Sequence, residues 1–267
     1  MRPAAQPYTI PGADPVSSGM PKKEVTVRNT LVTFSVMALL AAATASAGDL
    51  DLSPALTPGE FKELTLHLAE GILMPSGPSK PLGTAGFEIQ LLATWTDADS
   101  GASWWNHSMS GLSDTFGGLG TASVMGRVGL PWGIDVGGQI GLIANETFWS
   151  AELRKSLLEE NGFKPSLGLS AAYSMLTSGP VDLDVWSLDL GVSKRFTILV
   201  PYGTIGYRWW QGDATWGPPD DPVHGDTDRG SVHITAGVHV TLPLLGFRFE
   251  LRHGEVTAAY VGFGIGL

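Results

Sequence analysis

The sequence predicts an all-β fold, an antiparallel transmembrane β-barrel of about ten strands (range about 8 to 12) preceded by a short periplasmic helix or linker. Three observations indicate this fold. Apolar and polar residues alternate in segment after segment, the polar faces carry acids and bases together, and the 267 residues include 35 glycines. Because glycine is costly inside a helix, its abundance favours tightly turned β structure.

Composition excludes several classes of protein. With 43% hydrophobic and 16% charged residues, the chain is apolar enough to bury a core rather than remain disordered. The absence of cysteine excludes disulfide scaffolds, cysteine-ligated metal centres and thiol catalysis. A net charge of -10 repels phosphate backbones at long range, so we expect no nucleic-acid partner.

An export signal is expected near the N-terminus. Basic residues at positions 22, 23 and 28 precede an apolar run over 31–45, and the sequence Ala-Ser-Ala ends at position 47. A membrane helix needs about 20 apolar residues, so this shorter run predicts a cleavable signal peptide over 20–47. Residues 1–19 show no apolar periodicity and precede a second methionine, so we interpret them as a mis-assigned start or a non-structural extension.

Residues 48–83 are expected to form a periplasmic N-terminal segment. Pro58 and Glu60 are typical of the first turn of a helix, and the leucines over 64–68 fit helical spacing as well as strand alternation. We favour a short helix here, followed by a proline-rich linker over 75–81. The sequence leaves open whether the segment pairs with a neighbouring strand or plugs the barrel.

From position 84 to 267 the pattern has a period of two. In the clearest segment, Val232, Ile234 and Ala236 alternate with His233 and Thr235, which gives one apolar and one polar face. The same alternation predicts ten strands, at about 87–96, 121–130, 134–142, 147–157, 165–175, 183–193, 199–209, 231–242, 247–252 and 259–267.

The connections between these strands are expected to differ at the two ends of the barrel. Short turns alternate with long polar segments, as in barrels with short periplasmic turns and longer extracellular loops. The short turns are Pro131–Gly133, Glu159–Gly162, Lys194–Thr197 and Pro243–Gly246, and the long segments are Asp97–Gly120 and Gln211–Gly230.

The polar faces carry an unusual balance of charge. A soluble sandwich would turn such residues to water, whereas a lipid-embedded barrel encloses them and needs acids and bases to compensate each other. We therefore predict a lumen charge network of Glu88, Asp135, Glu152, Asp189 and Glu250 with Arg127, Arg154, Arg208, Arg248 and Arg252. His233 and His239 are expected to be lumen polar groups, because about 20 Å of strand separates them and a shared metal ion is excluded.

Aromatic residues near strand ends are expected to form girdles at the two membrane interfaces. These residues are Trp95, Trp132, Trp149, Tyr173, Trp186, Tyr202, Tyr207 and Trp209.

These features resemble the small, porin-like β-barrel proteins of the Gram-negative outer membrane. The resemblance covers residues 84–267 and includes a final strand with apolar residues at every second position from Ala259 to Leu267. In that family the last strand is the assembly signal and usually ends in Phe or Trp, whereas this chain ends in Leu. The resemblance implies an outer-membrane location, contact with outer-membrane lipid and lipopolysaccharide, and the barrel assembly machinery as a partner during biogenesis.

A barrel of about eight strands is just filled by its side chains, and about sixteen or more leave an aqueous channel. We therefore expect a narrow, charge-balanced lumen that acts in structure, ligand binding or the passage of a small solute, without a cofactor. Residues of two polar segments are candidates for ligand binding from outside. They are Trp104 and Trp105 in the first segment, and Asp220, Asp221, His224, Asp226 and Asp228 in the second, where we expect no specific metal site.

Two alternatives remain open. The first is a barrel hydrolase acting on lipid or peptide, with His253 and Glu255 beside one of four serines, although the mature chain lacks a Gly-x-Ser-x-Gly elbow. The serines are Ser103, Ser108, Ser110 and Ser113. The second alternative is a soluble periplasmic β-sandwich or lipocalin-like carrier, in which the apolar faces would form the core.

Overall fold

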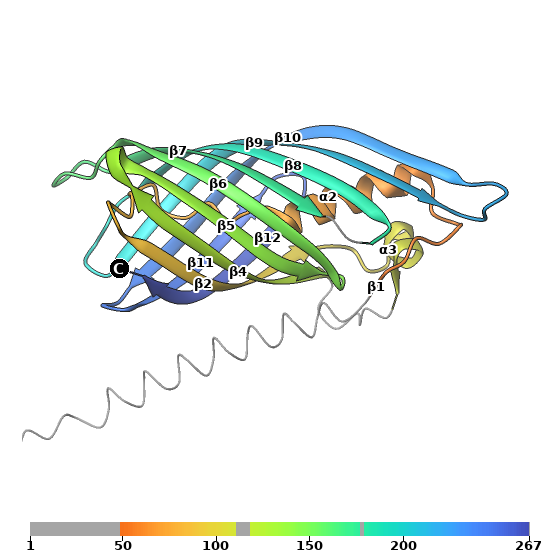
Figure 1. The fold of residues 1–267 in the computed structure, drawn as a ribbon, viewed down its shortest axis with the longest axis horizontal. Coiled ribbons are helices and arrows are strands. Elements are labelled where there is room, and N and C mark those ends of the chain that lie inside the picture. Colours follow the sequence, from red (N-terminus) through yellow and green to blue (C-terminus); the bar gives the residue numbers. More distant parts are fainter. Residues whose placement is uncertain (1–48, 111–117, 177–178, 267) are drawn as a thin grey trace, which may run out of the picture. The chain divides into compact units, whose positions relative to one another are not determined.

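The computed structural model describes residues 49–110, 118–176 and 179–266, and ten strands in this part of the chain close into one antiparallel barrel (Figure 1). The expected signal peptide at 20–47, the preceding residues 1–19, Ser113 and Leu267 lie outside the described residues. None of the described helices combines the length and the apolar character that a membrane span requires.

Each barrel strand pairs with its neighbours along the chain. The last strand closes the barrel against the first, with Gly266 opposite Glu88 and Ala258 opposite Thr96. The barrel therefore has no open edge, and the predicted ten-stranded fold is confirmed. The strands are β2 Phe87–Asp97, β4 Gly118–Leu130, β5 Ile134–Ile143, β6 Glu146–Leu158, β7 Ser166–Leu176, β8 Val181–Ser193, β9 Leu199–Trp216, β10 Val223–Thr241, β11 Leu245–His253 and β12 Thr257–Gly266.

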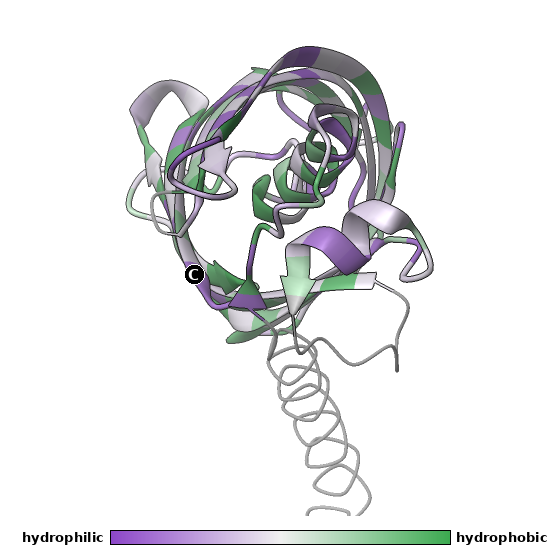
Figure 2. Cartoon of the chain, turned by 90° about the vertical axis from the view of Figure 1, so that its right-hand side faces the viewer, coloured by the Kyte–Doolittle hydropathy of each residue, from purple (hydrophilic) through white to green (hydrophobic). Residues whose placement is uncertain are grey.

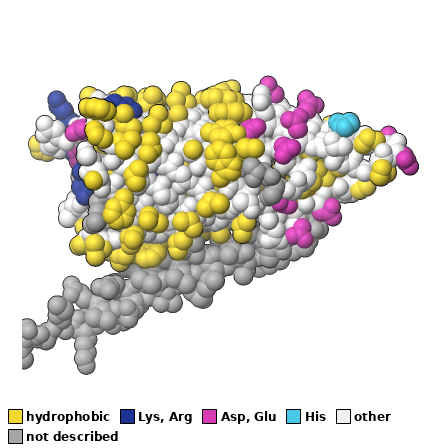
Figure 3. All heavy atoms as spheres, viewed as in Figure 1, with side chains coloured by type: hydrophobic (Ala, Val, Ile, Leu, Met, Phe, Trp, Pro, Cys, Tyr) yellow, Lys and Arg dark blue, Asp and Glu magenta, His cyan; other side chains and the backbone are white. Residues whose placement is uncertain are grey.

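The apolar face of the strands points outward. Val232 and Ile234 of β10 are 58% and 55% exposed, whereas His233 between them is 1% exposed. On the face shown in Figure 3, hydrophobic side chains cover the barrel wall, and acidic side chains gather beyond them at one end. A soluble sandwich or a lipocalin-like carrier would bury this apolar face, so that alternative does not fit the structure.

We call the two ends of the barrel the turn end and the loop end. At the turn end, β2 begins and β12 ends, and short connections such as η2 (Pro131–Gly133) join neighbouring strands. The loop end carries residues 98–110, which include the helix α3 (Ser103–Ser108) and the short strand β3 (Met109–Ser110). Strand β3 pairs with β1 (Asp49–Leu50), so the described chain begins at the loop end.

One expected loop is mostly strand. We predicted a long connection over 211–230, but β9 and β10 remain paired as far as Trp216 and Val223, and only residues 217–222 form the turn. The prediction failed because outward positions here become polar, as at Asp213 and Asp226, while backbone pairing continues. The alternation of apolar and polar side chains shows where one face of a strand meets an apolar medium. The ladder of backbone hydrogen bonds continues whether the outward side chains are apolar or polar.

Helix α2 (Pro58–Ile72) lies inside the barrel, as Figure 2 shows in a view toward one end. Its first turn is fixed by a capping box, in which Thr57 Oγ1 accepts from Glu60 N at 3.3 Å and Glu60 Oε2 accepts from Thr57 N at 2.8 Å. Every residue from Leu64 to Ile72 is buried. Only a helix enclosed on all sides buries its polar positions as well as its apolar ones.

The sequence left open whether this segment pairs with a neighbouring strand or plugs the barrel, and the structure places the helix inside the barrel as a plug. Close packing accompanies this placement. A Cβ atom at Gly71 would lie 2.7 Å from Ile143 Cδ1 in the wall, so the absence of a side chain there lets the helix approach β5.

Candidate functional site: the occupied lumen

Helix α2 is anchored in the lumen by one carboxylate. Glu70 is fully buried and forms ion pairs with Arg208 of β9 and, at 3.5 Å, with Arg252 of β11. Tyr260 of β12 donates to Glu70 Oε1 at 3.3 Å. Two guanidinium groups from the wall thus compensate one carboxylate of the helix, which is the condition for burying such a charge.

Sequence reasoning identified Arg208 and Arg252 as lumen residues but missed Glu70. In the sequence Glu70 is one of several polar residues of this helix, beside Lys62, Glu63 and His67, and that pattern is equally typical of a solvated helix face. Knowledge that the helix lies inside the barrel is needed before Glu70 can be assigned to these arginines.

The chain that follows the helix crosses the rest of the lumen toward the turn end, and we call residues 73–82 the strap. Arginine side chains donate to its backbone carbonyl groups: Arg252 Nη2 to Met74 O at 2.9 Å, and Arg127 Nη2 to Pro75 O at 2.8 Å. Arg154 Nη2 likewise donates to Gly77 O at 3.1 Å.

Carboxylates accept the backbone N–H groups of the strap. Glu250 accepts from Ser76 N at 3.1 Å and from Gly77 N at 3.2 Å, and Asp135 Oδ1 accepts from Leu82 N at 3.1 Å. The segment was expected to be a linker, but its backbone is bound along the lumen as a strand would be. Charged side chains supply the hydrogen bonds that an irregular buried backbone cannot make with itself.

The predicted charge network lies inside the barrel, where its members also pair with one another. Arg127 Nε lies 2.7 Å from Glu152 Oε2 and its Nη1 lies 3.5 Å from Glu88 Oε2. Arg248 Nη2 is 3.3 Å from Glu88. The remaining pairs join Arg154 to Glu152 at 3.5 Å and Arg252 to Glu250 at 3.2 Å.

The two predicted lumen histidines have separate partners. His233 Nε2 lies 2.6 Å from Asp189 Oδ1, and His239 Nε2 lies 3.9 Å from Glu88 Oε1. Among the described residues, no group of three potential ligands is placed to hold a metal ion.

Trp104 and Trp105 are not presented to a ligand, which corrects the expectation that they form an external binding loop. Both lie in α3 and are 6% and 4% exposed. Trp104 stacks on His67 of the plug helix at a ring-centroid distance of 4.5 Å. Burial of apolar surface against α2 explains this position, and α3 therefore covers the loop-end side of the plug.

A polar contact between α3 and the plug adds to this packing. Hydrogen bonds from the Ser103 side chain and from the Thr57 backbone hold the pKa of Glu60 down at about 2. His107 Nδ1 lies 3.2 Å from Glu60 Oε1. The carboxylate of Glu60 thus belongs both to the helix cap and to the contact with α3.

The acidic residues of the second predicted binding segment lie on the projecting β9–β10 hairpin. Asp220 and Asp221 are in its turn, and Thr215 Oγ1 lies 2.9 Å from His224 Nδ1. Asp226 is opposite Asp213 in the strand register and Asp228 is opposite Gln211. All these acids point to solvent, and the structure does not bring them together around one point.

Residues considered for hydrolysis are also dispersed. His253 Nδ1 lies 2.9 Å from Thr257 Oγ1, and Glu255 Oε2 accepts from Arg229 Nη2 at 3.0 Å. Ser108 Oγ donates to Trp104 O at 2.6 Å. None of these contacts joins a serine to a histidine.

One predicted girdle residue lies inside instead. Tyr202 is 6% exposed and donates to Glu250 Oε2 at 2.8 Å, because even positions of β9 face the lumen. Outside, Trp149, Tyr173, Trp186 and Trp209 follow one another across four strands with ring-centroid distances of 5.3, 5.3 and 6.0 Å.

The chain matches no protein-family model and no curated protein. Among solved structures it is similar to the N-terminal β-barrel domain of OprF from Pseudomonas aeruginosa, with 13% identity, coverage of 69% of this chain and 99% of that chain, and a TM-score of 0.35. It is also similar to Ail, the attachment invasion locus protein of Yersinia pestis, with 12% identity, coverage of 68% of this chain and 97% of that chain, and a TM-score of 0.32. A third similar structure is the translocator domain of the autotransporter NalP from Neisseria meningitidis, with 10% identity, coverage of 78% of this chain and 96% of that chain, and a TM-score of 0.40. At these identities and scores the likenesses support no inference about the function of this chain.

Proposed function

We propose that this chain is an outer-membrane barrel whose lumen is closed at rest by its own N-terminal helix and strap, and that it acts in structure or ligand binding rather than in free diffusion. The observation that carries the proposal is that charged side chains face the lumen and apolar side chains face outward, the reverse of the arrangement in a soluble protein. Lumen residues such as Arg208 and Arg248 have no exposure, while outward residues such as Ile140 are 58% exposed. Lipid stabilises that outer face and water does not.

The aromatic row supports the same environment and an orientation. Trp186 and Trp209 lie next to the polar outward positions Asp184 and Gln211, at the border between the apolar wall and the acidic loop end. Tryptophan and tyrosine prefer this kind of interface. In the proposed orientation the loop end faces outward and the turn end faces the periplasm.

The proposed partners follow from this location. Outer-membrane lipid covers the apolar wall, lipopolysaccharide surrounds the projecting hairpin, and the barrel assembly machinery inserts the chain. Cell fractionation, with gel mobility compared before and after heating, tests the location. We expect recovery with outer membranes and a heat-dependent mobility shift, whereas recovery in the soluble periplasm would contradict it.

Closure of the lumen is tested by conductance in planar bilayers. We expect the wild-type barrel to give few or brief openings, because α2 and the strap are held by ion pairs and hydrogen bonds to the wall. Glu70→Gln removes the charge that pairs with Arg208 and Arg252, so longer openings are expected. Glu63→Gln on the same helix is the matched control. The side chain of Glu63 is 51% exposed, and its ion pair with the partly exposed Arg229 is long, at 3.7 Å. A steadily conducting wild type would contradict the closed state.

We further propose that the role is not enzymatic. The separate contacts of His253 and Glu255 support this, because nucleophilic catalysis needs a base within hydrogen-bond reach of the nucleophile. Hydrolysis of a labelled lipid that disappears in His253→Ala would reverse the proposal.

A further inference from the structure

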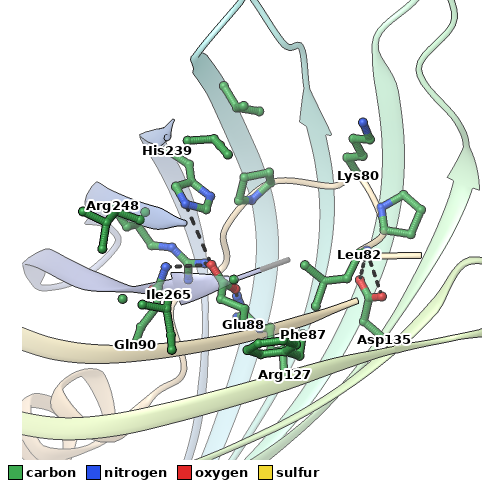
Figure 4. Close-up of a pocket in the computed structure, with 18 of the residues that line it drawn as sticks. Lys80, Leu82, Phe87, Glu88, Gln90, Arg127, Asp135, His239, Arg248 and Ile265 are labelled. Atoms are coloured by element: carbon green, nitrogen blue, oxygen red, sulfur yellow. Dashed lines mark hydrogen bonds and ion pairs between the residues drawn. The ribbon is translucent and has the colours of Figure 1, made fainter. Parts of the chain in front are cut away.

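A cavity of about 210 Å³ lies at the turn end of the barrel (Figure 4). The strap borders it with Lys80 and Leu82, and strands β2, β10 and β11 contribute Glu88, His239 and Arg248. Because the strap fills the lumen beyond, the cavity is accessible from the turn end. It is separate from the contact between Glu70 and the wall that anchors the plug.

The charge of the cavity wall is predominantly positive. Five basic side chains border it, and only two carboxylates, Glu88 and Asp135, do so. Asp135 accepts a backbone hydrogen bond from Leu82, and Glu88 already lies between two guanidinium groups. The basic residues are Lys80, Arg127, Arg154, Arg195 and Arg248.

The basic side chains differ in how many ion pairs and hydrogen bonds they already make within the protein. Arg127 and Arg154 each pair with Glu152 and donate to the strap. Lys80 and Arg195 are exposed at the rim. The rim therefore offers an ammonium and a guanidinium group to an anion that approaches from the turn end.

Arg248 provides an independent indication of a ligand. Its side chain is fully buried and only Nη2 is engaged, at 3.3 Å from Glu88, while Nε and Nη1 have no hydrogen-bond partner among the described residues. A buried N–H group without an acceptor is costly, so an acceptor in the cavity would lower the free energy of the folded protein. In Figure 4, Arg248 and His239 lie on the same side of the cavity, around Glu88.

Apolar side chains complete the wall and narrow the class of ligand. Val200, which faces the lumen from β9, borders the cavity together with Pro78 and Leu82 of the strap. A site with apolar walls and a few charged groups is typical of small-molecule recognition. An anion with a compact apolar body fits both parts of the wall, whereas an inorganic ion would leave the apolar part in contact with water.

We propose that this cavity binds a small organic carboxylate, with its anionic group toward Arg248, Lys80 and Arg195 and its body against Val200 and Leu82. The site goes beyond closure of the lumen and does not depend on the orientation of the barrel in a membrane. Guanidinium groups suit carboxylates because the hydrogen bonds are charge-assisted.

Calorimetric titration of the folded, detergent-solubilised protein tests the proposal with benzoate as the probe. Benzamide has the same apolar body without the charge, and sulfate has charge without the body. We expect benzoate to bind at least about tenfold more tightly than either at equal ionic strength. Equal binding of benzamide, tighter binding of sulfate, or no binding of benzoate would overturn the proposal.

Variants locate the site without disturbing the fold. Lys80→Ala combined with Arg195→Ala removes the two exposed rim charges, and we expect benzoate affinity to fall about three- to tenfold. Lys164→Ala is the matched control, because Lys164 is exposed at the same end but does not border the cavity. Heat-dependent gel mobility verifies folding of each variant. Unchanged benzoate binding in the double variant, or an equal loss in the control, would place the ligand elsewhere and refute the site.

Discussion

The carboxylate of Glu70 lies without solvent exposure between two guanidinium groups, those of Arg208 and Arg252. Burial makes each of these charges costly on its own, so removal of one leaves the others uncompensated. At the scale of single residues, the state of the plug is therefore most sensitive to this carboxylate.

Glu70→Gln is expected to lower the free energy of unfolding by about 3 to 5 kcal/mol, the range for breaking a buried ion pair. Urea unfolding in detergent, followed by tryptophan fluorescence, measures the change. Glu63→Gln, at an exposed position of the same helix, is expected to change it by under about 1 kcal/mol. Equal effects of the two substitutions would contradict the role given to Glu70.

Glu60 makes the helix cap sensitive to acid. Its pKa is lowered from 4.5 to about 2, chiefly by the Ser103 hydrogen bond, so the folded state favours the ionised carboxylate. The stabilisation is complete above about pH 4.5 and is lost as the pH falls toward 2. Hydrogen exchange of the amides of α2 is expected to accelerate over this interval in wild type. In Glu60→Gln the amides are expected to exchange faster at pH 6 and to show a flatter pH dependence.

At the scale of elements, the β9–β10 hairpin carries like charges in register. Asp182, Asp213 and Asp226 are directly opposite one another on three neighbouring strands and face outward. Like charges in such positions repel across the ladder. The hairpin therefore contributes an exposed acidic surface at a cost in stability, and this cost depends on ionic strength.

Asp213→Asn is expected to stabilise the hairpin by about 0.2 to 1 kcal/mol, because it removes the middle charge of the row. Hydrogen exchange of the β9 and β10 amides at low salt measures the gain, which should shrink in about 1 M salt. Asp220→Asn in the turn is the control, since Asp220 has no such partner in the strand register. A gain that persists in high salt would indicate another cause.

At the scale of the whole molecule, the path of the chain fixes which segments lie at each end. Residues 49–57 lie at the loop end, where β1 pairs with β3, and the strap reaches the turn end before β2 begins. The N-terminal segment thus runs through the lumen before the barrel starts. Its two ends therefore lie at opposite ends of the barrel.

Single cysteines test the proposed orientation, because the natural chain has none. Asp51→Cys and Asp220→Cys, both exposed at the loop end, are expected to react with a membrane-impermeant maleimide on intact cells. Phe163→Cys, in the turn between β6 and β7, is expected to react only after the outer membrane is permeabilised. The reverse pattern would show that the barrel has the opposite orientation. Labelling of the Asp220→Cys variant without labelling of the Asp51→Cys variant would contradict the path of the plug.

The sequence by itself determined the strands and their two faces. Alternation such as that of Val232, His233 and Ile234 is a local property, because successive side chains of a strand point to opposite faces whatever surrounds them. The opposing charges at Arg127 and Glu152 on polar faces were likewise readable, and they indicated an enclosed polar interior.

The tertiary structure alone decided what fills that interior and how its members pair. The helix over 58–72, the strap and Glu70 obtain their positions from closure of the barrel, which brings together residues as distant in sequence as Glu70 and Arg252. Burial of Trp104 against the plug helix depends on the same closure. Local periodicity carries no information about such contacts, because their partners are set by the pairing of β12 with β2 and not by neighbouring residues.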